Sequence, residues 1–267
     1  MLIKRTIKDS WLTSVIYIAV SILFAWIFVS IFPSFQSASA NFNELLKSYP
    51  ETLLKAFGYD PETPIFSSLE AYISLENFSF MYQVLVVGIA ASFASWAIAG
   101  QIEKKTMSVL LSLPLDRAEI FFAKYLSNTF IIVIFNAVSI YSIAFFAKVY
   151  HVDYNLEHYH LMFFASLLFS MSIYALSIFF SSIFRDKGKV IFFSTGIVLV
   201  MYAMFVISSL KENLIDLKYG SFFYYFNSTS ILAKGIIPDY MYLVFGGTII
   251  VFTALAFLIF SKRDISV

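Results

Sequence analysis

The chain of 267 residues has no cysteine, which excludes disulfide bonds, iron–sulfur clusters and thiolate zinc sites. Charged residues are scarce, at 13% of the chain, whereas about a quarter is usual in soluble globular proteins. The formal net charge of +1 implies no general attraction to nucleic acid. Because 60% of the residues are hydrophobic, we do not expect a soluble domain.

Motifs for nucleotide hydrolysis and covalent catalysis are also missing. A phosphate-binding loop requires Gly-x-x-x-x-Gly-Lys followed by Ser or Thr, but the pair Gly188-Lys189 is followed by Val190. The Gly-x-Ser-x-Gly elbow of serine hydrolases is absent from the sequence as well. We therefore expect no ATP hydrolysis by this chain itself, and no cofactor or metal bound by it.

What the sequence does contain is six apolar runs of 21–24 residues without Asp, Glu, Lys or Arg. They are residues 11–32, 79–100, 125–147, 161–184, 190–210 and 240–261. About 20 helical residues cross a hydrocarbon core of roughly 30 Å. A charge at the bilayer centre costs about 3 kcal/mol, so the exclusion of every charged residue supports the same interpretation. We predict an all-α integral membrane protein with six transmembrane helices in a single domain over residues 1–267, and no ionisable residue within a span.

The distribution of Lys and Arg predicts the orientation. Residues 1–10, 101–124, 185–189 and 262–267 hold 12 basic residues in 45 positions, whereas the remaining loops hold 6 in 88. Basic residues accumulate on the cytoplasmic side of membrane proteins. Both termini are therefore predicted to be cytoplasmic. Lys4, Arg5 and Lys8 lie among apolar residues, and residues 1–10 are expected to form a short helix at the inner interface.

A few polar residues invite functional interpretations. Gln83 and Asn136 lie within predicted spans, where such side chains either form hydrogen bonds between helices or line a cavity for a substrate. His151, His158 and His160 lie together in a predicted outer loop and could bind a metal. They lack the His-Glu-x-x-His spacing of zinc hydrolases, so a solvated loop is the simpler interpretation.

The longest charged interruption on the predicted inner side runs from Gln101 to Tyr125. Its apolar residues recur at helical spacing, which predicts an amphipathic helix; they are Ile102, Thr106, Val109, Leu110 and Leu113. Pro114 ends that helix because it has no N–H and its ring clashes with the preceding turn. Asp116 and Glu119 then have the spacing of a capping box that starts a second helix. A helix, a turn and a second helix entering the membrane are suited to contact with a partner.

The residues of this stretch also carry a family resemblance. EKKTMSVLLSLPLDR, from Glu103 to Arg117, resembles the inner loop of type-2 permease subunits of ATP-binding-cassette exporters, and Lys124 occupies a typical lysine position. Residues 46–58, residues 223–227 and Arg263-Asp264 are similar to other landmarks of that family. One departure is Lys105, which stands where the family usually has glycine. We expect a continuous helix from Gln101 to Leu113 to tolerate this lysine.

The resemblance implies a membrane-spanning subunit of an ATP-driven exporter in the cell membrane. Such a subunit pairs with a second permease copy, either identical or related. Each copy sits on a separate ATPase subunit, which would hold ATP and Mg. By this implication the cytoplasmic segment is the coupling helix, and its residues transmit the motion of the ATPase; they are Glu103, Lys105, Thr106, Leu110, Leu111, Pro114 and Arg117.

The cargo stays open, since an amphipathic, lipid-like, peptide or drug-like molecule would each suit the sequence. Two other functions also stay open. One is a membrane-anchored enzyme that uses the outer histidines, and the other is a membrane anchor for an ATPase that transports nothing.

Overall fold

The computed structural model describes residues 2–37, 65–112 and 114–264. The described residues form helices joined by turns, with no β-strand among them. The longer helices are α1 (Leu2–Ser37), α5 (Tyr82–Ala97), α8 (Arg117–Val149), α9 (Leu156–Ile183), α10 (Lys187–Leu210) and α12 (Met241–Lys262). The shorter elements are α4 (Leu69–Ile73), the π-helix η1 (Ser74–Met81), α6 (Ala99–Glu103), α7 (Met107–Leu111), the 3₁₀-helix η2 (Glu212–Gly220), α11 (Phe222–Tyr225) and the π-helix η3 (Thr229–Ala233).

Six helical segments in the described residues are long and apolar enough to cross a membrane, which confirms the predicted number of spans. They are Arg5–Ser37, Leu69–Ala97, Arg117–Val149, Leu156–Ile183, Lys187–Leu210 and Met241–Lys262. Residues 46–58, one of the stretches that resembles the family, lie outside the described residues.

The second span begins ten residues earlier than predicted, because α4, η1 and α5 follow one another without a break. The helix of this span therefore also holds Glu70 and Glu76, which precede the charge-free run predicted from residue 79. Glu70 is 6% exposed, and its Oε1 accepts a hydrogen bond from the backbone N–H of Asn155 at 2.7 Å. That hydrogen bond compensates the burial of this carboxylate near the end of the span.

Residues 2–10 continue directly into the first span instead of forming a separate interfacial helix. The hydroxyl of Ser14 donates to the carbonyl of Ser10 at 2.8 Å across the predicted boundary. No glycine or proline interrupts residues 2–32, so the helical hydrogen bonds run through from Leu2.

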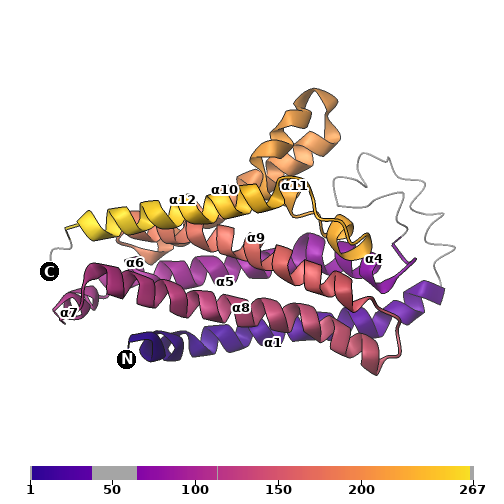
Figure 1. The fold of residues 1–267 in the computed structure, drawn as a ribbon, viewed down its shortest axis with the longest axis horizontal. Coiled ribbons are helices and arrows are strands. Elements are labelled where there is room, and N and C mark those ends of the chain that lie inside the picture. The colour runs from indigo at the N-terminus through magenta and orange to yellow at the C-terminus, as the bar shows by residue number, and fades with distance from the viewer. Residues whose placement is uncertain (1, 38–64, 113, 265–267) are drawn as a thin grey trace.

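Helix α9 lies at the centre of the bundle and packs against α12, α5, α8 and α10. Several of its buried residues are serines, which allow neighbouring helices to approach closely; they are Ser166, Ser170, Ser172, Ser177, Ser181 and Ser182. By contrast α1, α10 and α12 lie at the edge of the bundle (Figure 1) and leave large apolar side chains exposed, such as Leu12, Leu199 and Leu243.

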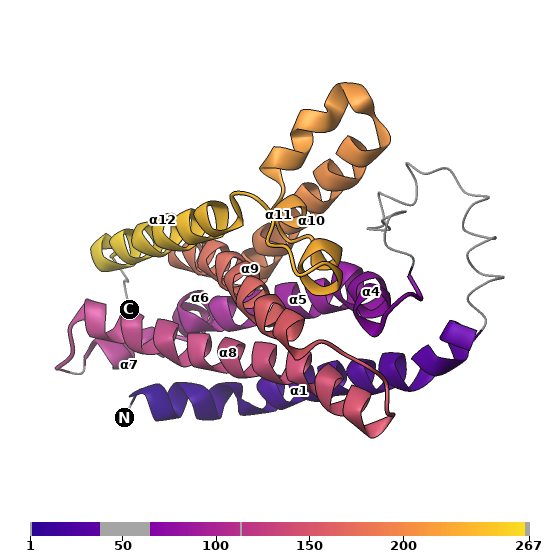
Figure 2. The ribbon, with the colours of Figure 1, turned by 45° about the vertical axis from the view of Figure 1, so that its right-hand side comes forward.

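The two ends of the bundle differ in chemistry. Both termini lie at the same end as α6 and α7 (Figure 1). This end, called the basic end below, carries most of the basic residues counted above for the predicted inner segments. At the other end, the last turns of α10 and η2 form a hairpin that projects from the bundle (Figure 2). The fold thus presents α6 and α7 beside both termini.

Candidate functional site

The helix predicted from Gln101 to Leu113 is divided into two short helices. α5 ends at Ala97, Ile98 leaves the helical region with φ −127° and ψ −63°, and α6 begins at Ala99. The backbone N–H of Ala99 is freed by this break and donates to Ser181 Oγ of α9 at 3.1 Å. After α6 the chain turns again before α7 starts at Met107. The prediction of one continuous helix is therefore wrong, and Leu113 lies outside the described residues.

The turn between α6 and α7 is built on Lys105, which has a φ of +57°. A left-handed conformation costs a residue with a Cβ about 1–2 kcal/mol, so the expectation that Lys105 continues a helix is also wrong. Hydrogen bonds back to α6 hold the turn. The N–H of Lys105 donates to Ile102 O at 3.0 Å, that of Thr106 donates to Gln101 O at 2.9 Å, and Thr106 Oγ1 donates to Gln101 Oε1 at 2.7 Å. Thr106 thus stabilises the turn within its own chain.

The turn changes which face of α7 is buried. Met107 is fully buried and Leu110 is 8% exposed, whereas Val109 is 62% exposed. The predicted apolar stripe that joined Val109 to Leu110 is wrong, because a helix that restarts at Met107 has a different register. Leu111 is half-buried and packs against the core. The spacing of Met107, Leu110 and Leu111 is the sequence signal that would have identified this buried face.

Glu103 connects α6 to α10. Its Oε2 accepts a hydrogen bond at 2.9 Å from the backbone N–H of Lys187, the first residue of α10. A carboxylate at this position satisfies one of the free N–H groups of the helix start and interacts favourably with the helix dipole. The ammonium groups of Lys104 and Lys187 lie 4.7 and 5.3 Å from the ring centre of Trp96, which adds a second contact between these segments.

Arg117 connects the start of α8 to the end of α12. Its Nη1 donates to the carbonyl oxygens of Ser261 at 3.1 Å and Arg263 at 2.5 Å. Arg263 in turn donates from Nη1 to Ser182 O at 2.7 Å and Phe184 O at 3.0 Å, at the end of α9. Two guanidinium groups thus bind the free carbonyls of two helix ends, where positive charge is favoured. The role of Arg263 was not inferred from the sequence, although a basic residue just after a helix is its usual signal.

The turn before α8 agrees with the sequence. α7 ends at Leu111, ahead of Pro114, which is exposed. The backbone N–H of Asp116 donates to Glu119 Oε2 at 3.1 Å, and the reciprocal capping contact is also present. The predicted helix stop and the predicted capping box are both confirmed.

Asn136 and Gln83 lie in the interior of the bundle. Asn136 is fully buried, and its Oδ1 accepts hydrogen bonds from the Tyr82 hydroxyl and from Ser170 Oγ, the latter at 3.2 Å. Its Nδ2 donates to Ile132 O at 2.8 Å. Asn136 therefore joins α5, α8 and α9 by hydrogen bonds. Gln83 is 7% exposed. A role of either residue in a substrate pathway stays a prediction.

The histidines do not converge. His158 Nδ1 lies 2.8 Å from Leu232 O, and His160 Nδ1 lies 2.8 Å from the Tyr141 hydroxyl. Across residues 2–37, 65–112 and 114–264, no group of three His, Cys, Asp or Glu side chains could hold a metal ion. This geometry gives a histidine-based metal site no support.

Two side chains connect the segment that contains α6 and α7 to spans that lie far away in sequence. The segment is held to the start of α10 through Glu103 and to the end of α12 through Arg117. A displacement of α6 and α7 would therefore reach several spans at once. Within the described part of the chain, the arrangement offers no group of residues suited to catalysis.

Comparison with known proteins agrees with this geometry. A family model described as ABC-2 family transporter protein matches residues 5–265. The match runs from the first turns of α1 past the end of α12. No curated protein matches the chain.

Proposed function

Since the chain belongs to the ABC-2 family of transporter proteins, we propose that it is the permease of an exporter powered by a separate ATPase subunit. The chain is a multi-pass protein of the cell membrane and the membrane subunit of an ABC transporter, and it is not itself an enzyme. The partner ATPase would bind ATP and Mg, since the chain contains no phosphate-binding loop of its own.

We place the docking surface for the ATPase on the exposed residues of the turn and of α7. This surface combines charge and apolar area: Lys105 and Val109 are exposed, and so are Pro114 and Leu115 beyond α7. An apolar side chain flanked by charges is the usual composition of a helix that binds in the groove of a partner. The concentration of basic residues at this end supports its position in the cytoplasm.

Arg117 is the observation that carries the proposal. It stands next to the docking surface and holds the end of α12, a helix that lies 143 residues away or more in sequence. Glu103 makes the corresponding contact with α10. Movement of the ATPase on nucleotide binding would thus be passed to α10 and α12. In this scheme Leu110 and Leu111 do not contact the ATPase. They attach α7 to the core of the permease.

The proposed cargo is an amphipathic molecule, which includes lipid-like, peptide and drug-like compounds. The central turns of the six spans carry no charged residue, which suits a cargo with an apolar portion. A second permease copy would complete the pathway, since apolar side chains of α10 and α12 are exposed in the single chain. A membrane anchor without transport would share every feature except movement of cargo.

Two substitutions separate docking from transmission. Val109→Asp places a charge in the docking surface and is expected to reduce recovery of the ATPase with the purified chain about tenfold or more, because an unpaired buried charge opposes binding. Glu103→Gln removes only the charge at the start of α10. It is expected to leave ATPase recovery unchanged and to lower transport and the stimulation of ATP hydrolysis severalfold.

Val149→Asp is the matched control, since Val149 is also exposed but lies at the other end of α8. It should not change ATPase recovery. Normal recovery with Val109→Asp would show that the ATPase docks elsewhere. Normal transport with Glu103→Gln would refute the transmission through α10. If the ATPase binds but no cargo moves in any reconstituted system, the anchor function is the better description.

A further inference from the structure

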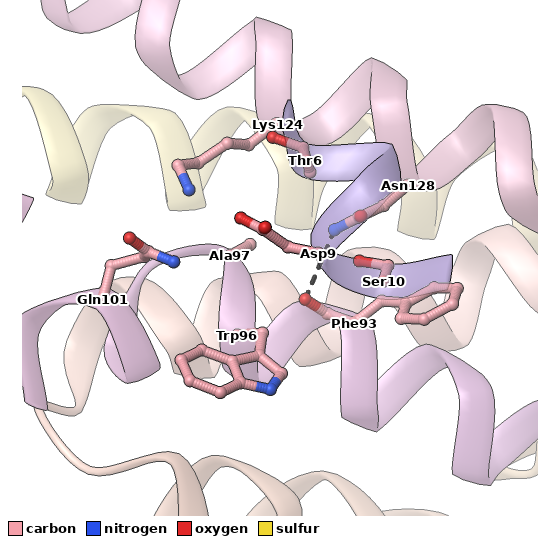
Figure 3. A pocket seen from close by; sticks show the side chains of 9 residues that line it. All are labelled: Thr6, Asp9, Ser10, Phe93, Trp96, Ala97, Gln101, Lys124 and Asn128. Carbon is pink, nitrogen blue, oxygen red and sulfur yellow. Dashed lines mark hydrogen bonds between the residues drawn. The ribbon is translucent and has the colours of Figure 1, made fainter. Parts of the chain in front are cut away.

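A cavity of about 240 Å³ opens at the basic end between α1, α5, α6 and α8 (Figure 3). Its lining is largely polar, with Asp9 from α1, Gln101 from α6, and Lys124 and Asn128 from α8. A second cavity of about 120 Å³ shares Asp9, Gln101 and Lys124 and adds Arg5. One water molecule fills about 30 Å³ in the liquid, so the larger cavity has room for a sizeable polar group.

Lys124 is the most unusual residue of this cavity, because its side chain is largely buried while its ammonium has only the nearby Asp9 carboxylate as an opposite charge. The side chain is 6% exposed, and its ammonium forms no hydrogen bond or ion pair within the described residues. Its charged neighbours are one carboxylate, Asp9, and one guanidinium, Arg5. The three groups together carry an excess of positive charge. Since burial of an unpaired charge is unfavourable, this site calls for an anion.

The side-chain oxygen of Asn128, one turn further along α8, lacks a hydrogen-bond donor. Asn128 is 2% exposed, and its Nδ2 donates to Phe93 O at 3.3 Å and lies 3.2 Å from the Tyr174 hydroxyl. The carbonyl of Phe93 can only accept, which fixes the orientation of the amide. Its Oδ1 then has no hydrogen-bond partner. Buried polar atoms in folded proteins are nearly always satisfied, so this oxygen is free to accept from a ligand.

The position of the cavity indicates where the ligand resides. Trp96 lines it and is 37% exposed, with two lysine ammonium groups over its ring. Tryptophan and lysine side chains are typical of the interface between membrane and water, where phospholipid headgroups lie. Figure 3 shows the side chains of Lys124, Asp9 and Gln101 directed toward the same space. A headgroup-sized polar molecule at this depth would reach all of them.

We propose that this cavity binds a phosphate that carries an N–H or O–H donor on a short arm, as in phosphoethanolamine and phosphoglycerol headgroups. Lys124 binds the phosphate from the larger cavity and Arg5 from the adjoining smaller one, and the donor reaches Asn128 Oδ1 or the Asp9 carboxylate. Residues four apart on a helix lie about 6 Å apart, which suits recognition of two groups on one small ligand. Through Gln101 the ligand also contacts α6, so its occupancy ties α1 to the segment that moves.

The test is native mass spectrometry of the full-length purified chain titrated with three lipids of equal acyl chains. Phosphatidylethanolamine and phosphatidylglycerol have headgroup donors, whereas phosphatidylcholine has the same phosphate without an N–H or O–H. We expect the first two to bind at least about tenfold more tightly than the third. Lys124→Met should remove this binding, and Lys148→Met, an exposed position near the other end of α8, should retain it.

Two further measurements are needed. One shows whether the phosphate comes from a lipid or from a soluble molecule, and the other keeps the test valid if Lys124→Met does not fold. If soluble phosphoethanolamine binds and Lys124→Met removes that binding, the site exists and its ligand is a free phosphate compound and not a lipid. Asp9→Asn should reduce the preference for phosphatidylethanolamine over phosphatidylcholine while the phosphate still binds. Equal affinity for all three lipids, or binding unaffected by both Lys124→Met and Asp9→Asn, overturns the proposal.

Discussion

Lys105 determines at the scale of one residue how α7 faces the rest of the chain. Its positive φ reverses the chain direction after α6, and this reversal brings Met107 and Leu110 into the core. The cost of that conformation is offset by the hydrogen bonds that Lys105 and Thr106 return to α6. A glycine would adopt the same backbone without the steric cost of a Cβ.

We therefore expect Lys105→Gly to raise the free energy of unfolding by up to about 1 kcal/mol, and Lys105→Val to lower it by about 1 kcal/mol or more. Thermal unfolding of the purified chain in detergent measures both changes. Lys104→Gly is the control, because Lys104 has an ordinary φ of −84°. A gain in stability with Lys104→Gly as large as that with Lys105→Gly would show that the left-handed conformation is not the cause.

The same residues show which local features a sequence reveals. The capping contact of Asp116 with Glu119 depends on two side chains three positions apart, and the sequence predicted it correctly. The conformation of Lys105 could not be predicted from its chemistry, since lysine has no preference for positive φ. The only hint was the departure noted in the sequence, since the family that this stretch resembles is expected to have glycine at this position.

At the scale of elements, three helix ends are joined by side chains from other elements. Glu103 binds the start of α10, Arg117 binds the end of α12, and Arg263 binds the end of α9. Each contact satisfies backbone groups that a helix leaves free, so each ties a segment at the basic end to the end of a span. These spans are thus connected at their ends, in addition to their packing along the bundle.

Replacement of Arg117 by methionine keeps the apolar stem and removes the donors. Hydrogen bonds from a charged group contribute about 1.5–3 kcal/mol, so the last turn of α12 should open more often in this variant. Hydrogen exchange of the amides near Lys262 should rise about tenfold or more, with unchanged exchange in the middle of α12. Unchanged protection near Lys262 would mean that Arg117 does not hold this helix end.

The spans themselves were predictable because hydrophobicity and length alone define them. The start of the second span was not. Residues 67–79 contain Ser67, Ser68, Glu70, Ser74 and Asn77, and this polar composition predicted a loop. In the structure the helix starts at Leu69, with Ser68 as its N-cap, and runs on through residue 79. Within it Ser74 Oγ donates to Glu70 O at 2.7 Å and lies 3.2 Å from Ser228 O. Ser228 is 154 residues away, so no local pattern could reveal this contact.

At the scale of the whole molecule, the bundle has a packed centre and apolar edges. Two helices each expose a pair of apolar side chains seven residues apart. The pairs are Phe192 and Leu199 on α10, and Leu243 and Ile250 on α12. η2 packs against α10 in the projecting hairpin (Figure 2), and its Ile215 and Tyr219 are also exposed. The larger exposed apolar area on α10 and η2 makes α10 the expected contact with a second permease copy.

The absence of cysteine allows a direct test. Leu199→Cys introduces one thiol on α10, and mild oxidation in the membrane should give a covalent dimer on a non-reducing gel. Leu243→Cys, on α12, should stay monomeric under the same conditions. The reverse result would place the second copy against α12 and contradict the expected interface. Sequence alone could not choose between the two helices, because lipid-facing and protein-facing apolar residues look alike.

The contact between Arg117 and the end of α12 also has a consequence for biosynthesis. A chain is made from its N-terminus, so the start of α8 enters the membrane long before the carbonyls of Ser261 and Arg263 leave the ribosome. Until then the guanidinium of Arg117 has no carbonyl to bind at this position. A chain whose synthesis stops early would therefore insert most of its spans but lack the hydrogen bonds between Arg117 and the end of α12. The contact between Arg117 and α12 can therefore form only after synthesis has reached the end of the last span.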